Sequence, residues 1–149
     1  MKVRPVRPDD AAAVAALLGE LGYPVSPAVV AARLAERAPR EADAAWVLTA
    51  DEQDEGDAVG FVAGHVFHPY ELDRPVAEIT ALVVSATHRR SGAATALVGA
   101  VEGWAETWSC QRITVASSLE REGAHAFYDR RGYRQLAKKL EKSLDPPPS

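Results

Sequence analysis

The chain has 149 residues, of which 47% are hydrophobic and 26% are charged, and its formal net charge is -4. This length fits one domain, and the composition is that of an ordinary globular protein with enough apolar residues for a core. The acidic balance argues against a dedicated nucleic-acid-binding protein, which usually carries a basic stripe.

Residues 1–39 predict one strand and two helices. Residues 3–7 form a short apolar and basic alternation, typical of a strand. Apolar residues at i, i+3, i+4 and i+7 predict a helix that follows the N-cap residues Pro8–Asp10 and ends at Gly22. A second helix is expected to begin at Ser26 and Pro27 and to stop before Pro39.

The rest of the chain predicts five strands and two helices. We expect strands over 45–50, 58–67, 76–84, 112–116 and 133–140, and helices over 92–108 and 122–131. The acidic run 51–57 is expected to be a hairpin turn. The order β-α-α-β-β-β-α-β-α-β predicts an α/β (α+β) fold with one mixed sheet flanked by helices. Residues 1–144 are expected to form one domain, followed by a disordered tail over 145–149.

Neither a bound metal nor an internal disulfide is expected. Cys110 is the single cysteine, and no Cys/His spacing predicts a metal site. The N-terminal residues lack the apolar run of a signal peptide, and no stretch approaches the roughly 20 apolar residues of a membrane span. We therefore expect a cytoplasmic protein without a membrane partner.

The most informative stretch is a basic turn between a strand and a helix. The strand ends at Val84, Arg89 and Arg90 follow, and a helix begins at once after Gly92. A helix N-terminus offers unpaired N–H groups and a partial positive charge, and together these bind phosphate. Glycine lets an anion approach the backbone closely. The residues alone leave open whether the turn binds an anion or whether its arginines are merely solvated, and they match neither a Walker loop nor a dinucleotide fingerprint.

The stretch Arg89–Ala94 resembles the [Q/R]-x-x-G-x-[G/A] signature of the Gcn5-related N-acetyltransferases, the GNAT superfamily. A second motif of that family is matched by Ala124, Phe127 and Tyr128, and Gly132 follows in register. The form of this motif is similar to a bacterial branch that acetylates small-molecule amines, including aminoglycosides. The resemblance implies a GNAT fold with a mostly antiparallel sheet, acetyl-CoA as cofactor, and a small-molecule amine as partner.

The resemblance also implies which residues hold acetyl-CoA. Loop amides would bind the pyrophosphate, the strand before the loop would bind the pantetheine arm, and the second motif would complete the site. Ser118 stands where relatives have an asparagine, and its hydroxyl has a shorter reach. The implied residues are Leu82, Val83, Val84, Arg89, Arg90, Ser91, Gly92, Ala93, Ala94, Thr95, Ser118, Ala124, Phe127 and Tyr128.

Two side chains are candidates for proton transfer. By resemblance, Tyr128 is the general acid that protonates the leaving sulfur; the alternative is a tyrosine that only packs. Glu78 lies within an apolar strand, where a carboxylate is costly to bury, and it is the candidate base; the alternative is an edge glutamate that points at solvent. Strand alternation places Glu78, Thr80, Leu82 and Val84 on one face.

The acceptor is left open by the sequence. Weak candidates for its pocket are Tyr23, His68, Tyr70 and Glu71, which lie where this branch shapes its acceptor site. An aminoglycoside, a polyamine, an amino acid and a protein amine all remain alternatives, because acceptor pockets are built from loops. The resemblance also allows a homodimer. A second class of function is a GNAT domain that binds acyl-CoA as a sensor or structural module without turnover.

Overall fold

The structure is a computed structural model, and it describes residues 1–51, 56–115, 123–136 and 139–148. The chain divides into two compact units, residues 1–115 and residues 116–149. Each unit is described by itself below.

The first unit is built on one five-stranded sheet in the order β1-β2-β3-β4-β5. Neighbouring strands are antiparallel except for the parallel pair β4 and β5. A parallel pair needs a long crossover, and the third α-helix supplies it. The strands are β1 (Lys2–Pro5), β2 (Asp43–Thr49), β3 (Ala58–Phe67), β4 (Val76–Val84) and β5 (Arg112–Val115). The predicted fold class, with one mixed and mostly antiparallel sheet between helices, is confirmed.

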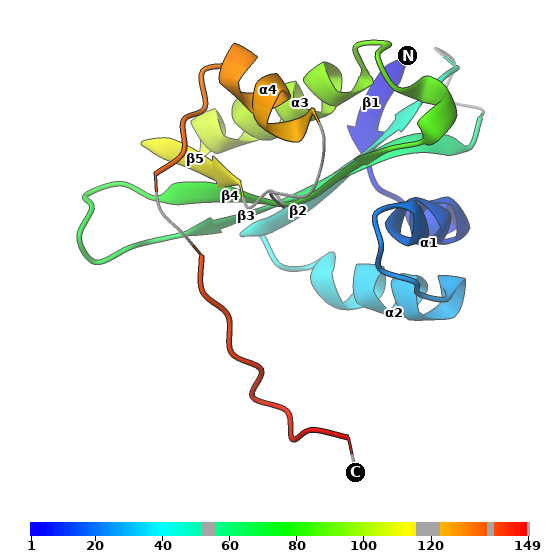
Figure 1. Ribbon diagram of the computed structural model, residues 1–149, viewed down its shortest axis with the longest axis horizontal. Helices are drawn as coiled ribbons and strands as arrows, with labels where there is room; N and C mark the ends of the chain where they lie inside the picture. The colour runs from blue at the N-terminus through cyan, green and yellow to red at the C-terminus, as the bar shows by residue number, and fades with distance from the viewer. Residues whose placement is uncertain (52–55, 116–122, 137–138, 149) are drawn as a thin grey trace. The chain divides into compact units, whose positions relative to one another are not determined.

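Helices cover both faces of this sheet (Figure 1). A short 3-10 helix, η1 (Pro8–Asp10), leads into α1 (Ala11–Glu20), which lies with α2 (Pro27–Arg37) on one face. The Oγ of Ser26 accepts a hydrogen bond from the N–H of Val29 at 3.2 Å, so the predicted N-cap of α2 is confirmed. The core beneath α1 joins Val14 and Leu17 to Phe61 of β3 and Val83 of β4.

Helix α3 (Ala93–Thr107) covers the opposite face (Figure 1). Two glycines of β3 let it approach the sheet closely. A Cβ built at Gly60 would lie 2.9 Å from Cδ1 of Leu97, and one at Gly64 would lie 3.2 Å from the ring of Trp104. Trp104 also makes edge-to-face contacts with Trp46 and Trp108. Side chains at these two β3 positions would therefore push α3 off the sheet.

Strand β4 contains a β-bulge that changes which of its side chains share a face. Ala63 of β3 pairs with Ala81, and the next residue, Gly64, pairs with Ile79, so Thr80 is the extra residue. The predicted alternation of Glu78, Thr80, Leu82 and Val84 on one face is therefore wrong. Glu78 shares a face with Ala81 and Val83, whereas Leu82 lies on the face of α3. A single extra residue reverses a period of two, and nothing in the local sequence marks it.

The second unit contains α4 (Ala124–Arg130), which begins after Gly123. The ring of Tyr128 makes edge-to-face contacts with Phe127 and Tyr133. The predicted last strand over 133–140 is not formed by the described residues 133–136 and 139–140. This stretch carries no β-branched residue and is rich in basic side chains, both of which disfavour a strand.

Candidate acetyl-donor site

The loop between β4 and α3 has the geometry of an anion cradle. A 3-10 turn, η2 (Ala86–His88), follows β4, and Gly92 is the N-cap residue of α3. Arg90 and Gly92 both lie in the left-handed region, with φ of 63° and 86°. A turn that contains left-handed residues can direct backbone N–H groups toward one side and form a concave site for an anion. The sequence predicts an anion site here, and the left-handed Gly92 is compatible with that prediction.

The amides of this loop are available to a ligand. Among the described residues, no acceptor contacts the N–H groups from Arg89 to Thr95, and the first bond of the helix is from Ala96 N–H to the carbonyl of Gly92. A Cβ at Gly92 would meet only the methyl of Met1, at 4.0 Å. The positive N-terminal end of α3, a helix of 15 residues, therefore begins at a glycine that no side chain covers closely.

Several contacts hold the loop in place. Arg89 Nε donates to the carbonyl of Val84 at 3.4 Å, and Ser91 Oγ donates to the carbonyl of His88. On the other side, Glu20 at the end of α1 accepts from the N–H of Ala86 at 3.1 Å. Within the described parts of the chain, neither Arg89 nor Arg90 pairs with a carboxylate. Their positive charges thus remain at the exposed rim of the cradle.

The other predicted donor residues of this unit flank the loop. Ala93 is buried beneath the first helical turn, Ala94 is half-buried and Thr95 is exposed. The end of β4, with Leu82, Val83 and Val84, runs beyond the described part of β5, which pairs only with Val76–Ile79. Val83 is buried in the core, so its side chain is not open to a ligand.

Glu78 is half-buried and lies at the centre of a polar row across the sheet. The register pairs it with His65 of β3 on one side and with Thr114 of β5 on the other. His65 Nδ1 lies 2.8 Å from Oδ1 of Asp43 on β2. Asp43 carried no signal, because its contact spans 22 positions and depends on the register of two strands.

The second motif and the acceptor candidates lie elsewhere in the chain. Ala124, Phe127 and Tyr128 share helix α4 of the second unit, where Tyr128 is buried. Ser118 lies outside the described residues. The acceptor candidates are exposed: Tyr23 follows α1, and His68, Tyr70 and Glu71 lie in the hairpin between β3 and β4. In the part of the chain that is described, no hydrogen bond or ring contact joins Tyr23 to that hairpin.

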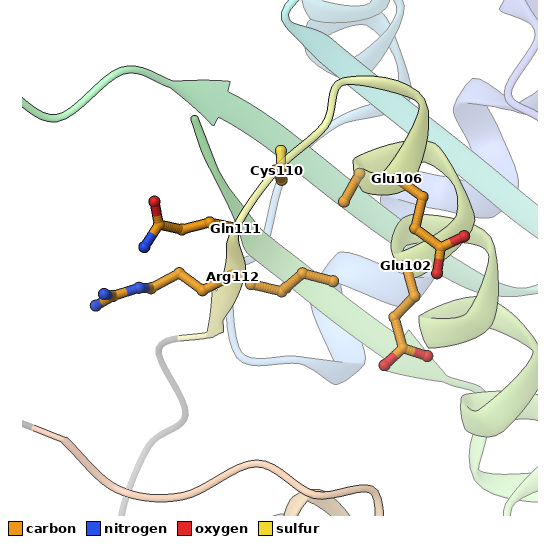
Figure 2. Close-up of a pocket in the computed structure, with 7 residues that line it drawn as sticks. Glu102, Glu106, Cys110, Gln111 and Arg112 are labelled. Atoms are coloured by element: carbon orange, nitrogen blue, oxygen red, sulfur yellow. The ribbon is translucent and has the colours of Figure 1, made fainter. Parts of the chain in front are cut away.

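A separate open pocket of about 350 Å³ lies where α3 ends and β5 begins, at the end of α3 opposite Gly92. Figure 2 shows Glu102 and Glu106 extending from α3, whereas Gln111 and Arg112 extend away from them. Burial raises the pKa of the Cys110 thiol, which also lines the pocket. Two carboxylates on the wall repel a diphosphate, so this pocket does not suit an acetyl-CoA-like ligand.

Comparison with known proteins identifies the family. The family model described as "Acetyltransferase (GNAT) family" matches residues 13–133. The chain belongs to this GNAT family. The resemblance on which the loop and the second motif were interpreted is therefore confirmed.

Individual relatives of this GNAT protein are distant. An aminoglycoside N(6')-acetyltransferase type 1 from Acinetobacter haemolyticus is 33% identical over 64 residues, which is 43% of this chain and 44% of that protein. The counterpart from Acinetobacter baumannii is 34% identical over 61 residues, 41% of this chain and 42% of that protein. These matches thus span less than half of the curated relatives.

Solved structures agree over the whole fold. An acetyltransferase from Trypanosoma brucei has a TM-score of 0.80 at 24% identity, with 96% of this chain and 99% of that chain covered. An aminoglycoside 6'-N-acetyltransferase from Acinetobacter haemolyticus has a TM-score of 0.78 at 20% identity, with 99% and 100% covered. At such identities the likeness establishes the fold alone.

The described residues of this GNAT protein contain neither a membrane-spanning helix nor a metal-binding cluster. None of their helices combines the length and the apolar character that crossing a bilayer requires. No group of three or more His, Cys, Asp or Glu side chains among them is arranged to hold a metal ion.

Proposed function

We propose that this GNAT acetyltransferase moves an acetyl group from acetyl-CoA to a primary amine of a small molecule, by direct attack in a ternary complex. The observation that carries the proposal is the cradle at the start of α3, where open backbone amides surround a glycine that has no side chain to block them. Membership in an acetyltransferase family supports the same conclusion.

The cradle fits the diphosphate of acetyl-CoA. The N–H groups from Arg89 to Thr95 would donate to its oxygens, and the Arg89 and Arg90 side chains would add charge at the rim. The backbone of Leu82–Val84 would hold the pantetheine arm in the manner of an added strand. When bound, acetyl-CoA supplies the acetyl group as an activated thioester. Ser118, Ala124 and Phe127 are proposed to complete its binding.

The chain's own groups would then move protons. Glu78 Oε would take the proton from the acceptor amine, and Tyr128 Oη would donate one to the departing sulfur. A backbone N–H of β4 near Leu82 would stabilise the negative charge on the acetyl oxygen. Each role is a family role carried onto a residue of matching type, and Glu78 in addition lies half-buried in a polar row.

The acceptor is proposed to be a small molecule because the two curated relatives are named for aminoglycosides, which are small polyamines. Tyr23, His68, Tyr70 and Glu71 are proposed as its surroundings. The domain boundary at residue 144 and the homodimer stay predictions.

The test is release of CoA thiol from acetyl-CoA with a panel of aminoglycosides, polyamines, amino acids and peptide amines. Release clearly above hydrolysis without amine supports the enzyme. Binding of CoA without turnover on any amine contradicts it and favours the sensor. Cys110 is a free thiol, so its own contribution to a chromogenic readout has to be subtracted. A Cys110→Ser variant provides the blank.

A further inference from the structure

A row of ionisable side chains crosses the sheet on the face that α1 and α2 cover. Asp43 of β2 pairs with His65 of β3, and His65 pairs with Glu78 of β4. Ala45, Ala63 and Ala81, the neighbouring row on this face, pack against the core beneath α1. The row therefore begins where the apolar core ends, one step from the β3–β4 hairpin.

Asp43 fixes the state of the histidine. A carboxylate can only accept, so the Nδ1 of His65, 2.8 Å from Oδ1 of Asp43, must carry the hydrogen. In the neutral ring Nε2 then holds the lone pair. The other oxygen of Asp43 lies 3.9 Å from a nitrogen of Arg40, which also pairs with Glu36. These contacts hold the carboxylate of Asp43 in place.

The imidazole is held but still reaches water. The ring of His65 stacks on that of Phe67, with centroids 6.0 Å apart and an angle of 10°. The side chain of His65 nevertheless remains 46% exposed. Directly opposed residues of antiparallel strands have Cβ atoms roughly 5 Å apart, so Glu78 and His65 are within reach of each other or of one bridging water.

The bulge at Thr80 is what creates this arrangement. It turns Glu78 to the face of His65 rather than to that of α3. Beyond Glu78 the row continues to Thr114 of β5, whose buried Oγ1 has no partner among the described residues. Arg112 lies one row further along the same strand. Among the described residues that share this row or contact it, the charged groups on the side of the imidazole are Asp43 and Glu78, with Arg40 behind Asp43.

We propose that His65, oriented by Asp43, relays the proton from Glu78 to solvent. This inference rests on the proposed function. Acetylation of an ammonium group releases one net proton, which must leave a half-buried carboxylate before the next turnover. The proton passes from the amine to Glu78 Oε, from Glu78 to His65 Nε2, and from His65 to water or buffer. No other reactant is required, and each group returns to its starting state.

The relay can be tested with two variants and a matched control. His65→Gln removes the titrating ring, Asp43→Asn keeps an acceptor for Nδ1 but removes its charge, and Asp57→Asn makes the same change in an exposed turn. Turnover is measured at low buffer concentration, with and without added imidazole, and CoA affinity is measured by calorimetry. Because imidazole attacks thioesters itself, each rate is corrected with an enzyme-free blank.

We expect kcat of His65→Gln to fall roughly tenfold, less than for loss of a general base because water can partly replace a relay. Added imidazole should restore most of the lost rate of His65→Gln and leave the rate of the wild type unchanged. The kcat of Asp43→Asn should lie between those of the wild type and His65→Gln. CoA affinity should be the same in all four proteins. A His65→Gln rate equal to that of Asp57→Asn, or one that imidazole does not restore, would overturn the relay alone. Absence of turnover in the wild type would overturn the proposed function and the relay together.

Discussion

Both terminal guanidinium nitrogens of Arg4 donate hydrogen bonds to the carboxylate of Asp10, at 2.7 Å and 2.9 Å. The backbone N–H of Arg7 donates to the same carboxylate at 2.7 Å. The side chains of Arg4 and Asp10 are both buried. This ion pair fixes the turn between β1 and α1. At its other end α1 holds the turn before the cradle, through Glu20 and Ala86. The loop that forms the cradle is thus anchored to α1, and the position of α1 depends on the buried ion pair of Arg4 and Asp10.

Replacing Asp10 with alanine should destabilise the protein by about 3 kcal/mol, because it leaves a buried arginine and a backbone N–H without their acceptor. The free energy of unfolding from urea titrations measures the loss. Asp9→Ala is the control, since Asp9 is exposed and such changes usually cost less than about 0.5 kcal/mol. Equal stability of the two variants would contradict the role of the ion pair.

The same pair makes stability depend on pH. Burial alone would raise the pKa of Asp10, but the hydrogen bonds from Arg4 and Arg7 and their positive charges outweigh it, so the pKa lies below the usual 3.8. The unfolded chain therefore binds the proton first as pH falls. The contribution is complete above that usual value and is lost as pH falls through the lower, folded pKa.

We therefore expect the stability difference between wild type and Asp10→Asn to be constant from pH 7 to about 5 and to shrink below about pH 4. Urea unfolding at a series of pH values measures this. A difference that grows toward low pH would show that the sign is wrong.

Much of the fold could be read from local patterns. The strand over 76–84 and the Ser26 cap were predicted as found, because alternation and capping are properties of neighbouring residues. The cradle followed from one glycine between a strand and a helix. Its left-handed Gly92 agrees with the residue type that such a conformation favours.

The parts of the fold and the site that were not predicted depend on strand register, which local sequence patterns do not determine. The bulge at Thr80 exists because β3 and β4 pair with one unequal step, and it moves Glu78 to the other face. The contact between Asp43 and His65 follows from a second register, that of β2 and β3. The expected last strand over 133–140 relied on its place after Gly132, and its weak strand propensity was the better guide.

Gly92→Ala tests the cradle directly. Alanine at φ of 86° is strained, and because a Cβ there would meet only Cε of Met1 at 4.0 Å, the change acts mainly through the backbone of the loop. We expect CoA affinity to fall at least tenfold, measured by calorimetry. Gly103→Ala is the matched control: it lies in the same helix, its Cβ meets nothing within 4 Å, and alanine there should raise stability by up to about 1 kcal/mol. Equal CoA affinity in both variants would remove the cradle from the donor site.

Tyr128→Phe tests the proposed general acid. The phenylalanine ring keeps the edge-to-face contacts with Phe127 and Tyr133, so the change removes little more than the hydroxyl. We expect kcat to fall roughly a hundredfold, because a positioned proton donor typically contributes that much, while CoA affinity stays the same. Tyr133→Phe, in which the partner ring loses its own hydroxyl, should keep the wild-type rate. If Tyr128→Phe also kept the wild-type rate, the departing thiolate would need no acid, and Tyr128 would be a packing residue. If it lost CoA affinity as well as rate, its role would lie in binding the donor rather than in proton transfer.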